Sequence, residues 1–322
     1  MYPRRSFFPI VLALLALVGI FAGWQYNQTA SHSQRPMTAR IIPRTDGNKT
    51  LVTDKNFLND AGTSAGNKSS STSPKLQSVS PDTVSAEAYL VGNVETGKIY
   101  LAKDIDTVLP VASMSKLVTA IAATDTLAPT TTITITPEEA DTYPDHSHIH
   151  AGETFTVHEL LYPLLMDSSN IAANTLASST NLQTFMNLMN SYAWEIGMNG
   201  AFFQDPSGLS AHNTASARDF FALARYLYKN RPDILAITRI AQAAVSTTTL
   251  HEAHDFVNIH PFVSDPRFLG GKTGHTNAAL DTMMTIMDIQ KQPLVFVVLR
   301  SDDRRQEDTN LLIDQVEHLL NK

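Results

Sequence analysis

The residues best suited to chemistry are Ser113 and Lys116, three positions apart at the start of an apolar stretch. On a helix, residues at i and i+3 share a face, so the hydroxyl and the amine can meet. Burial and the positive end of a helix dipole would lower the pKa of the lysine. A neutral amine can then take the serine proton and make the hydroxyl a nucleophile. The alternative is a serine that caps the helix and a lysine whose amine reaches the surface.

Two further short motifs carry polar groups that could serve the same site. Lys272-Thr273-Gly274 follows Gly270-Gly271 and is expected to lead into a strand, where glycines permit close approach of a ligand. Its lysine and threonine can hold a carboxylate. Ser168-Ser169-Asn170 offers a hydroxyl and an amide on a short loop between two apolar segments. The alternatives are the polar start of an edge strand and a helix cap, and Ser179-Thr180-Asn181 has the same Ser-x-Asn spacing.

Three histidines, His146, His148 and His150, alternate along the chain. On a strand they would share a face and could bind a metal ion. Beyond Asp145 the sequence offers no obvious acidic or fourth ligand nearby. We therefore expect a polar surface loop near the site, and we predict neither a metal nor a cofactor.

The elements that must position these motifs are strand-rich at both ends and mostly helical in the middle. Apolar runs at 86–93 and 99–102 flank the turn Glu95-Thr96-Gly97 and predict a hairpin. Strands are also expected at 282–287 and 294–299, and helices at 114–124, 157–165, 171–177, 182–195, 217–229 and 303–320. The pattern predicts an α/β fold of the α+β kind. One antiparallel sheet combines the two ends, helices cover its faces, and the helical middle forms a subdomain.

The N-terminus carries an uncharged apolar run of 18 residues, Phe7 to Trp24, behind Arg4 and Arg5. As a helix it would be about 27 Å long, close to the roughly 30 Å hydrocarbon core of a bilayer. The two arginines favour an N-terminus that stays inside, with the rest of the chain outside the cytoplasm. Residues 1–24 are thus expected to anchor the protein in the cell membrane. A cleaved signal peptide is the alternative.

Residues 25–82 are rich in Ser, Thr, Asn, Gln and Gly, a composition typical of a disordered tether. This leaves 83–322 as one catalytic domain. The formal charge of −7 divides into +6 for residues 1–80 and −13 for 81–322. An acidic body disfavours nucleic-acid binding, which depends on neutralising phosphates. The chain has no cysteine, which excludes disulfides and zinc–cysteine sites.

The order of the three motifs, with 55 residues from Ser113 to Ser168 and 104 from Ser168 to Lys272, has a known parallel. It resembles the D-alanyl-D-alanine carboxypeptidases among the low-molecular-mass penicillin-binding proteins. The resemblance runs from about Ala86 to the C-terminus and includes the segments LPVASMSKLVT (109–119), LLYPLL (160–165), FQDPSGL (203–209) and GKTGHT (271–276). Two departures are Ser169, where these enzymes usually have Gly, and Asn258-Ile259-His260, where Asn-Thr-Asn is common.

The resemblance implies a beta-lactamase/transpeptidase-like fold and a serine peptidase that removes the terminal D-Ala of peptidoglycan stem peptides and is inhibited by penicillins. It assigns Ser113 as the nucleophile, Lys116 as the base and Ser168 as the proton relay to the leaving amine. It also implies that Asn170 binds the substrate amide, that Lys272, Thr273 and Gly274 bind the terminal carboxylate, and that the backbone N–H groups of Ser113 and His275 form the oxyanion hole.

The motifs leave three other functions open. An endopeptidase that cuts peptidoglycan crosslinks uses the same acyl-enzyme chemistry, so the motifs barely separate it from a carboxypeptidase. A class A beta-lactamase would need a carboxylate that activates the deacylating water, and only Glu195, followed by Asn199, formally matches that element. A catalytically dead wall-binding module has no chemical need for Ser113, Lys116 and Lys272 together.

Overall fold

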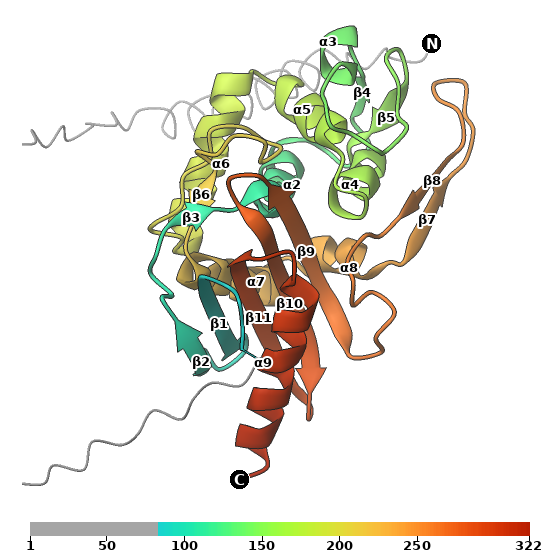
Figure 1. Ribbon diagram of the computed structural model, residues 1–322. Helices are drawn as coiled ribbons and strands as arrows, with labels where there is room; N and C mark the ends of the chain where they lie inside the picture. The colour runs from blue at the N-terminus through green and yellow to red at the C-terminus, as the bar shows by residue number, and fades with distance from the viewer. Residues whose placement is uncertain (1–82) are drawn as a thin grey trace, which may run out of the picture. The chain divides into compact units, whose positions relative to one another are not determined.

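The computed structural model describes residues 83–322, and its centre is a five-stranded antiparallel sheet in the order β2-β1-β11-β10-β9 (Figure 1). The strands are β1 (Ala88–Asn93), β2 (Ile99–Lys103), β9 (Phe268–Thr276), β10 (Leu280–Ile289) and β11 (Gln292–Ser301). Ala88 pairs with Leu299 and Asn93 with Leu294, so the two ends of the domain are joined through β1 and β11. The predicted α+β class and the sheet built from the two ends are both confirmed.

Both faces of this sheet are covered, which explains why β10 and β11 are almost continuously buried. Successive residues point to opposite faces, so Leu90 joins one hydrophobic core and Val91 the other. Helices α7 (Ala217–Asn230) and α8 (Pro232–Arg239) cover one face, and α9 (Arg305–Leu320) covers the other (Figure 1). The buried Asp308 on α9 accepts hydrogen bonds from the Ala86 N–H and the Ser301 hydroxyl, which ties the helix to both ends of the domain.

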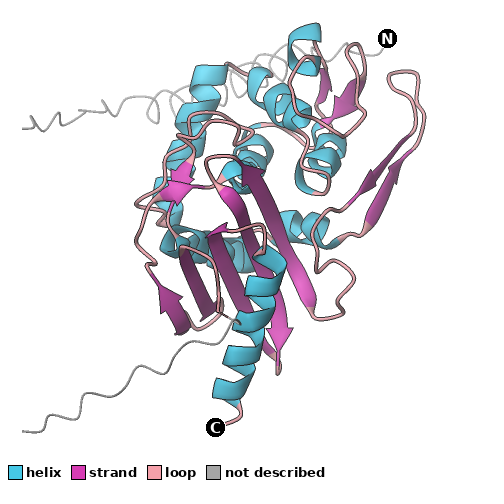
Figure 2. Cartoon of the chain, viewed as in Figure 1, coloured by secondary structure: helices cyan, strands magenta, loops and turns pink. Residues whose placement is uncertain are grey.

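The helical subdomain packs around α2 (Lys116–Thr126), which is buried from Lys116 to Ala123. Its neighbours are α4 (Val157–Leu165), α5 (Asn170–Ser178) and α6 (Leu182–Ile196) (Figure 2). The short α3 (Pro137–Ala140) and the strand pair β4 (Thr132–Thr134) and β5 (Thr154–Thr156) complete it. Because α2 is apolar on every side, it can only be stable inside this layer of helices.

Four further strands have only two to four residues each and were not predicted because they are short. Strands β3 (Leu109–Pro110) and β6 (Thr214–Ala215) pair across the start of the nucleophile segment. Strands β7 (Gln242–Val245) and β8 (His254–Val257) form a hairpin outside the main sheet (Figure 1). The largest difference from expectation is β9: Lys272-Thr273-Gly274 does not lead into a later strand but lies within a strand of its own at the edge of the sheet.

The predicted membrane anchor, residues 1–24, and the predicted tether, residues 25–82, lie outside the described residues. Within 83–322, no helix combines the length and apolar character needed to cross a bilayer. The division into residues 1–24, 25–82 and 83–322 therefore stays a prediction.

Candidate active site

Ser113 lies in the short 3-10 helix η1 (Ala112–Ser115), which runs directly into α2. The predicted helix at 114–124 is confirmed, with a tighter first turn. Ala112 has a φ of 50°, and Gly208, with a φ of 89°, packs against it so closely that a Cβ there would lie 2.0 Å from the Ala112 carbonyl oxygen. Only glycine fits this contact, which holds the nucleophile turn against the 203–210 loop.

Lys116 is fully buried one turn after Ser113, and its amine contacts three oxygens. The Nζ atom lies 2.9 Å from Ser113 Oγ, 2.7 Å from Asn170 Oδ1 and 2.6 Å from the Ser207 carbonyl oxygen. Two of these oxygens can only accept hydrogen bonds. A neutral amine therefore donates its two protons to Asn170 and Ser207 and directs its lone pair at the Ser113 hydroxyl.

Burial lowers the pKa of Lys116 to about 7, because desolvation disfavours the charged amine. The carboxylates of Asp205 and Asp145 oppose this effect and limit its size. Lys116 is then neutral in about half of the molecules at pH 7, so its amine can act as a base at physiological pH.

The Ser-x-Asn motif that reaches the site is Ser168-Ser169-Asn170, at the start of α5. Ser168 adopts a left-handed φ of 66°, and the buried Ser169 caps the helix by accepting from the Ala172 N–H at 3.0 Å. The second Ser-x-Asn sequence, 179–181, has a purely structural place: Ser179 ends α5, and Asn181 caps α6.

Asp145 organises this motif, although sequence reasoning considered it only as a metal ligand. One carboxylate oxygen accepts from Ser169 Oγ at 2.8 Å and from the Ile171 N–H at 2.9 Å, and the other accepts from the Ser147 N–H at 2.9 Å. Although burial alone would raise the pKa of Asp145, these hydrogen bonds outweigh it, so that the carboxyl pKa lies below its ordinary value. The turn signal Asp145-His146-Ser147, a carboxylate two residues before a hydroxyl, is the only local hint of this role.

Lys272 faces the site from β9 and is also buried. Its Nζ atom lies 2.9 Å from Ser168 Oγ and 2.9 Å from the Thr273 carbonyl oxygen. Burial and the neighbouring charges of Lys116 and Arg305 lower the Lys272 pKa well below its ordinary value. A Cβ on Gly274 would lie 3.0 Å from the Ser113 nitrogen, so this glycine permits β9 to pass directly beside the nucleophile.

A cavity of about 240 Å³ joins these motifs. The predicted residues that line it are Ser113, Ser168, Asn170, Thr273, Gly274 and His275. Lys116 and Lys272 are not among its lining residues, but their amines contact Ser113 and Ser168, which are. Its other lining residues are Pro144, Asp145, His146, Asp167, Leu209, Ile259 and Arg305. All predicted site residues thus line this cavity or contact a residue that does, although they come from three separate segments of the chain.

Two further residues that sequence reasoning missed support the site from outside its motifs. The carboxylate of Asp205 accepts from the backbone N–H groups of Ser207, Gly208 and Ser210, and so it shapes the loop whose carbonyl holds Lys116. Arg305 donates to the Gly274 carbonyl oxygen at 3.1 Å and to Asp281 at 2.8 Å. Its guanidinium brings a positive charge to the cavity from α9. Arg305 lies 33 positions beyond Lys272 and belongs to no motif, so the sequence does not indicate this role.

The alternating histidines lie in a loop without regular structure, as predicted, and His146 lines the cavity. Within 83–322, the one group with metal-ligand spacing is His275, Asp281 and Asp303. There, His275 and Arg305 already share the same Asp281 oxygen at 2.9 and 2.8 Å. A positively charged guanidinium at that oxygen favours an ion-pair network over a cation site.

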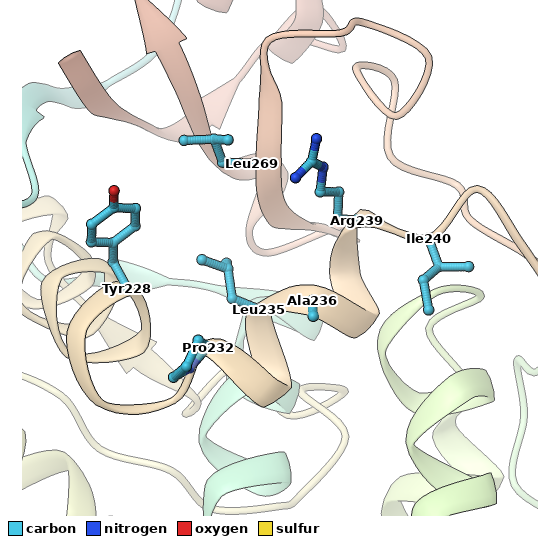
Figure 3. Close-up of a pocket in the computed structure, with 7 residues that line it drawn as sticks. All are labelled: Tyr228, Pro232, Leu235, Ala236, Arg239, Ile240 and Leu269. Atoms are coloured by element: carbon cyan, nitrogen blue, oxygen red, sulfur yellow. The ribbon is translucent and has the colours of Figure 1, made fainter. Parts of the chain in front are cut away.

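A larger cavity, of about 500 Å³, has a lining of its own (Figure 3). It is lined by Tyr228, Pro232, Leu235, Ala236, Arg239, Ile240 and Leu269. None of its lining residues belongs to the three motifs, so size alone does not mark the active site.

A serine held by a buried lysine, with a second lysine–serine pair across the cavity, defines the site of a serine acyl-transfer enzyme that needs no histidine. The chain belongs to the D-alanyl-D-alanine carboxypeptidase family of serine peptidases, whose model matches residues 75–303. The expected resemblance is therefore confirmed.

The curated relatives are named either as endopeptidases or as carboxypeptidases. The chain is 32% identical over 228 residues to a D-alanyl-D-alanine endopeptidase of Escherichia coli, an alignment that covers 68% of this chain and 72% of that protein. It is 28% identical over 204 residues to the D-alanyl-D-alanine carboxypeptidase DacB2 of Mycobacterium tuberculosis, covering 62% and 69% of the two chains.

Solved structures agree on the fold. A D-alanyl-D-alanine carboxypeptidase from Mycobacterium tuberculosis matches with a TM-score of 0.67 and 25% identity, over 76% of this chain and 95% of that one. The Streptomyces K15 DD-transpeptidase matches with a TM-score of 0.65 and 21% identity, over 72% and 98%. The transpeptidase-like fold predicted from the motifs is thus confirmed.

Proposed function

We propose that this serine peptidase removes the terminal D-Ala from peptidoglycan stem peptides through an acyl-enzyme on Ser113, and that penicillins inhibit it by acylating the same hydroxyl. The observation that carries the proposal is the setting of Lys116. Two fixed carbonyl-type oxygens hold the amine 2.9 Å from Ser113 Oγ, and burial brings its pKa to about 7. This is the geometry and protonation state that a general base requires.

In the first step, Lys116 takes the hydroxyl proton as Ser113 Oγ attacks the carbonyl carbon of the D-Ala-D-Ala bond. The negative charge that develops on the carbonyl oxygen is received by the backbone N–H groups of Ser113 and His275. The direction of the His275 N–H supports this role. Gly271 N–H points away from β10 and donates to Thr238 Oγ1, and the ladder is regular from 271 to 275. Because N–H directions alternate along a strand, the His275 N–H also points away from β10.

In the second half of this step, the C–N bond breaks and the leaving D-Ala amine takes a proton. Ser168, whose Oγ lies 2.9 Å from Lys272 Nζ, passes to the amine the proton that Lys116 took from Ser113, so Lys116 becomes neutral again. Asn170 binds the substrate amide, while Lys272, Thr273 and Gly274 receive the terminal carboxylate. Arg305 adds a further cation at the Gly274 end of β9. Water then hydrolyses the Ser113 ester and frees the shortened peptide.

Two experiments test this proposal. Ser113→Ala should abolish covalent labelling by a fluorescent penicillin, and persistent labelling would exclude Ser113 as the nucleophile. Mass spectrometry of muropeptides incubated with the 83–322 domain should show monomers that lose one D-Ala. Ser179→Ala, which changes the serine of the unused Ser-x-Asn sequence, is the matched control and should leave both results unchanged.

A D,D-endopeptidase is the second candidate, since relatives from Escherichia coli, Pseudomonas aeruginosa and Haemophilus influenzae at 28–32% identity carry that name. The same muropeptide experiment separates the two, because an endopeptidase converts crosslinked dimers into monomers. The beta-lactamase alternative loses support. Glu195 is exposed near the end of α6 and does not line the cavity, so it is not placed to activate a deacylating water there.

We also propose that the enzyme works at the outer face of the cell membrane, held by residues 1–24 and spaced by 25–82. The support is the apolar run behind Arg4 and Arg5, together with a substrate that lies in the cell envelope. Full-length protein should fractionate with membranes and resist extraction by high salt, whereas a chain that begins at residue 83 should not. Release of the full-length protein in a shortened form would favour a cleaved signal peptide.

A further inference from the structure

Asp167 is a titratable residue of the cavity wall to which the mechanism above gives no role. It directly precedes Ser168 and lines the same cavity. Its Oδ1 atom is buried and has no hydrogen-bond partner among the described residues. A buried acceptor without a partner costs stability, so packing and hydrogen bonding do not explain a carboxylate at this position.

The charged groups around Asp167 come from both sides of the cavity. Asp145 repels it, whereas Lys272, His148 and His146 attract it. Burial and Asp145 together raise the pKa of Asp167 to about 6. At neutral pH the side chain is therefore mostly ionised, and it places a negative charge beside the Ser168–Lys272 pair.

The surroundings of Lys272 disfavour the charged form of its amine. It is buried, Arg305 and the protonated form of Lys116 repel its ammonium group, and its two hydrogen-bond acceptors, Ser168 Oγ and the Thr273 carbonyl, are neutral. All of these charges favour loss of its proton. Asp167 is the acidic group that acts against them. A neutral Lys272 would carry no charge with which to hold a carboxylate.

We propose that Asp167 is a positioning residue whose carboxylate is the counter-charge that keeps Lys272 an ammonium ion. The acidic groups of the site then divide their work: Asp145 and Asp205 act on Lys116, and Asp167 acts on Lys272. This division lets one buried lysine serve as a neutral base while the other stays a cation. The inference rests on the proposed role of Lys272 in binding the terminal carboxylate.

The opposite effect of Asp167 is direct repulsion of the substrate carboxylate, and the two effects predict opposite results. If repulsion dominates, Asp167→Asn tightens substrate binding. If the counter-charge dominates, the same variant lowers the protonated fraction of Lys272 and weakens binding. The sign of the change in KM therefore decides between them.

The test follows the titration of Lys272 by NMR of lysine labelled with 13C at Cε, with the signal assigned through Lys272→Arg. In Asp167→Asn the Lys272 midpoint should fall by about one pH unit, the lower end of the effect of a nearby opposite charge. The alkaline limb of kcat/KM for a D-Ala-D-Ala peptide should move down by the same amount, and KM should rise. Asp167→Glu, which keeps the charge, should stay close to the wild type.

Asp141→Asn is the matched control, because it removes the same charge from an exposed position of the same subdomain. It should leave the Lys272 midpoint in place. A midpoint that stays or rises in Asp167→Asn, or a KM that falls, overturns the proposal. A lower melting temperature with an unchanged Lys272 titration would show a purely structural role and would overturn it too.

The NMR titration also separates this inference from the proposed function. Wild-type enzyme that releases no D-Ala, but whose Lys272 midpoint still depends on Asp167, contradicts the proposed function and supports the counter-charge. Enzyme that releases D-Ala with a Lys272 midpoint independent of Asp167 contradicts the counter-charge alone.

Discussion

The pH dependence of Ser113 acylation follows directly from the burial of Lys116. An exposed lysine with an ordinary pKa near 10.4 is neutral in only about one molecule in 2,500 at pH 7. With the pKa at about 7, half of the enzyme carries a neutral base at that pH. Burial thus raises the population of active base roughly 1,000-fold, which corresponds to about 4 kcal/mol at 1.36 kcal/mol per pKa unit.

The sign of the effect is fixed by the chemistry, because only the deprotonated amine accepts the Ser113 proton. The second-order rate constant for acylation by a penicillin should be constant above pH 8 until other groups titrate. It should fall to half at about pH 7. At pH 5 it should be about a hundredfold below the plateau, since a single proton suppresses the base tenfold per pH unit.

Stopped-flow or quench-labelling with a fluorescent penicillin measures this rate without any contribution from deacylation. Circular dichroism at each pH verifies that the domain stays folded, and Lys116→Ala should remove the acidic limb along with 10²- to 10⁴-fold of the rate, the usual contribution of a general base. An acidic limb centred above pH 9, or a rate independent of pH between 5 and 8, would refute the assignment of a neutral Lys116 as the base.

Three further predictions concern packing, stability and binding. Gly208→Ala should abolish penicillin labelling and lower the free energy of unfolding by about 2–5 kcal/mol, because the new Cβ would lie 2.0 Å from the Ala112 carbonyl oxygen and the φ of 89° is unfavourable for alanine. Gly152→Ala is the control, since Gly152 has a similar φ of 90° but nothing within 4 Å of the new Cβ. In urea denaturation it should show only the smaller cost of the backbone conformation. Burial lowers the pKa of His260 to about 3, so as the pH falls the unfolded chain takes up this proton before the folded protein does. The stability that the neutral His260 contributes is therefore complete above about pH 6.5 and is lost as the pH falls toward 3, by up to about 5 kcal/mol. Urea denaturation at pH 7 and pH 4.5 should therefore show a smaller acid-induced loss for His260→Gln than for the wild type, and equal losses would contradict this. Arg305→Ala should raise KM for a D-Ala-D-Ala peptide about tenfold or more with little change in kcat, the loss expected for one charge-assisted hydrogen bond, whereas a fall in kcat alone would assign Arg305 a different role.

Much of the fold could be predicted because its signals are local. The hairpin β1–β2 follows from two apolar runs around a turn, and α4 was predicted with the bounds that the structure has, Val157–Leu165. Strand β9 was not predicted. Its central residues, Gly270 to Gly274, are small or polar because η1 and α8 approach the strand closely, so they lack the apolar pattern of a strand.

The sequence by itself determined the spacing of Ser113 and Lys116, since three residues of helix bring a hydroxyl and an amine to one face whatever surrounds them. It also determined that both ends of the catalytic domain are rich in strands and that the nucleophile is a hydroxyl in a chain without cysteine.

Only the tertiary structure decided which Ser-x-Asn sequence reaches the site and how far the pKa of each buried lysine is lowered. Asn170 and Ser207 come from 54 and 91 residues beyond Lys116, yet together they fix its amine and remove it from water. A pKa depends on burial and on charges in space, and the order of residues along a chain does not specify either. The roles of Asp145, Asp167, Asp205 and Arg305 depend for this reason on the tertiary structure, which brings three of them to the cavity wall and places Asp205 near Lys116.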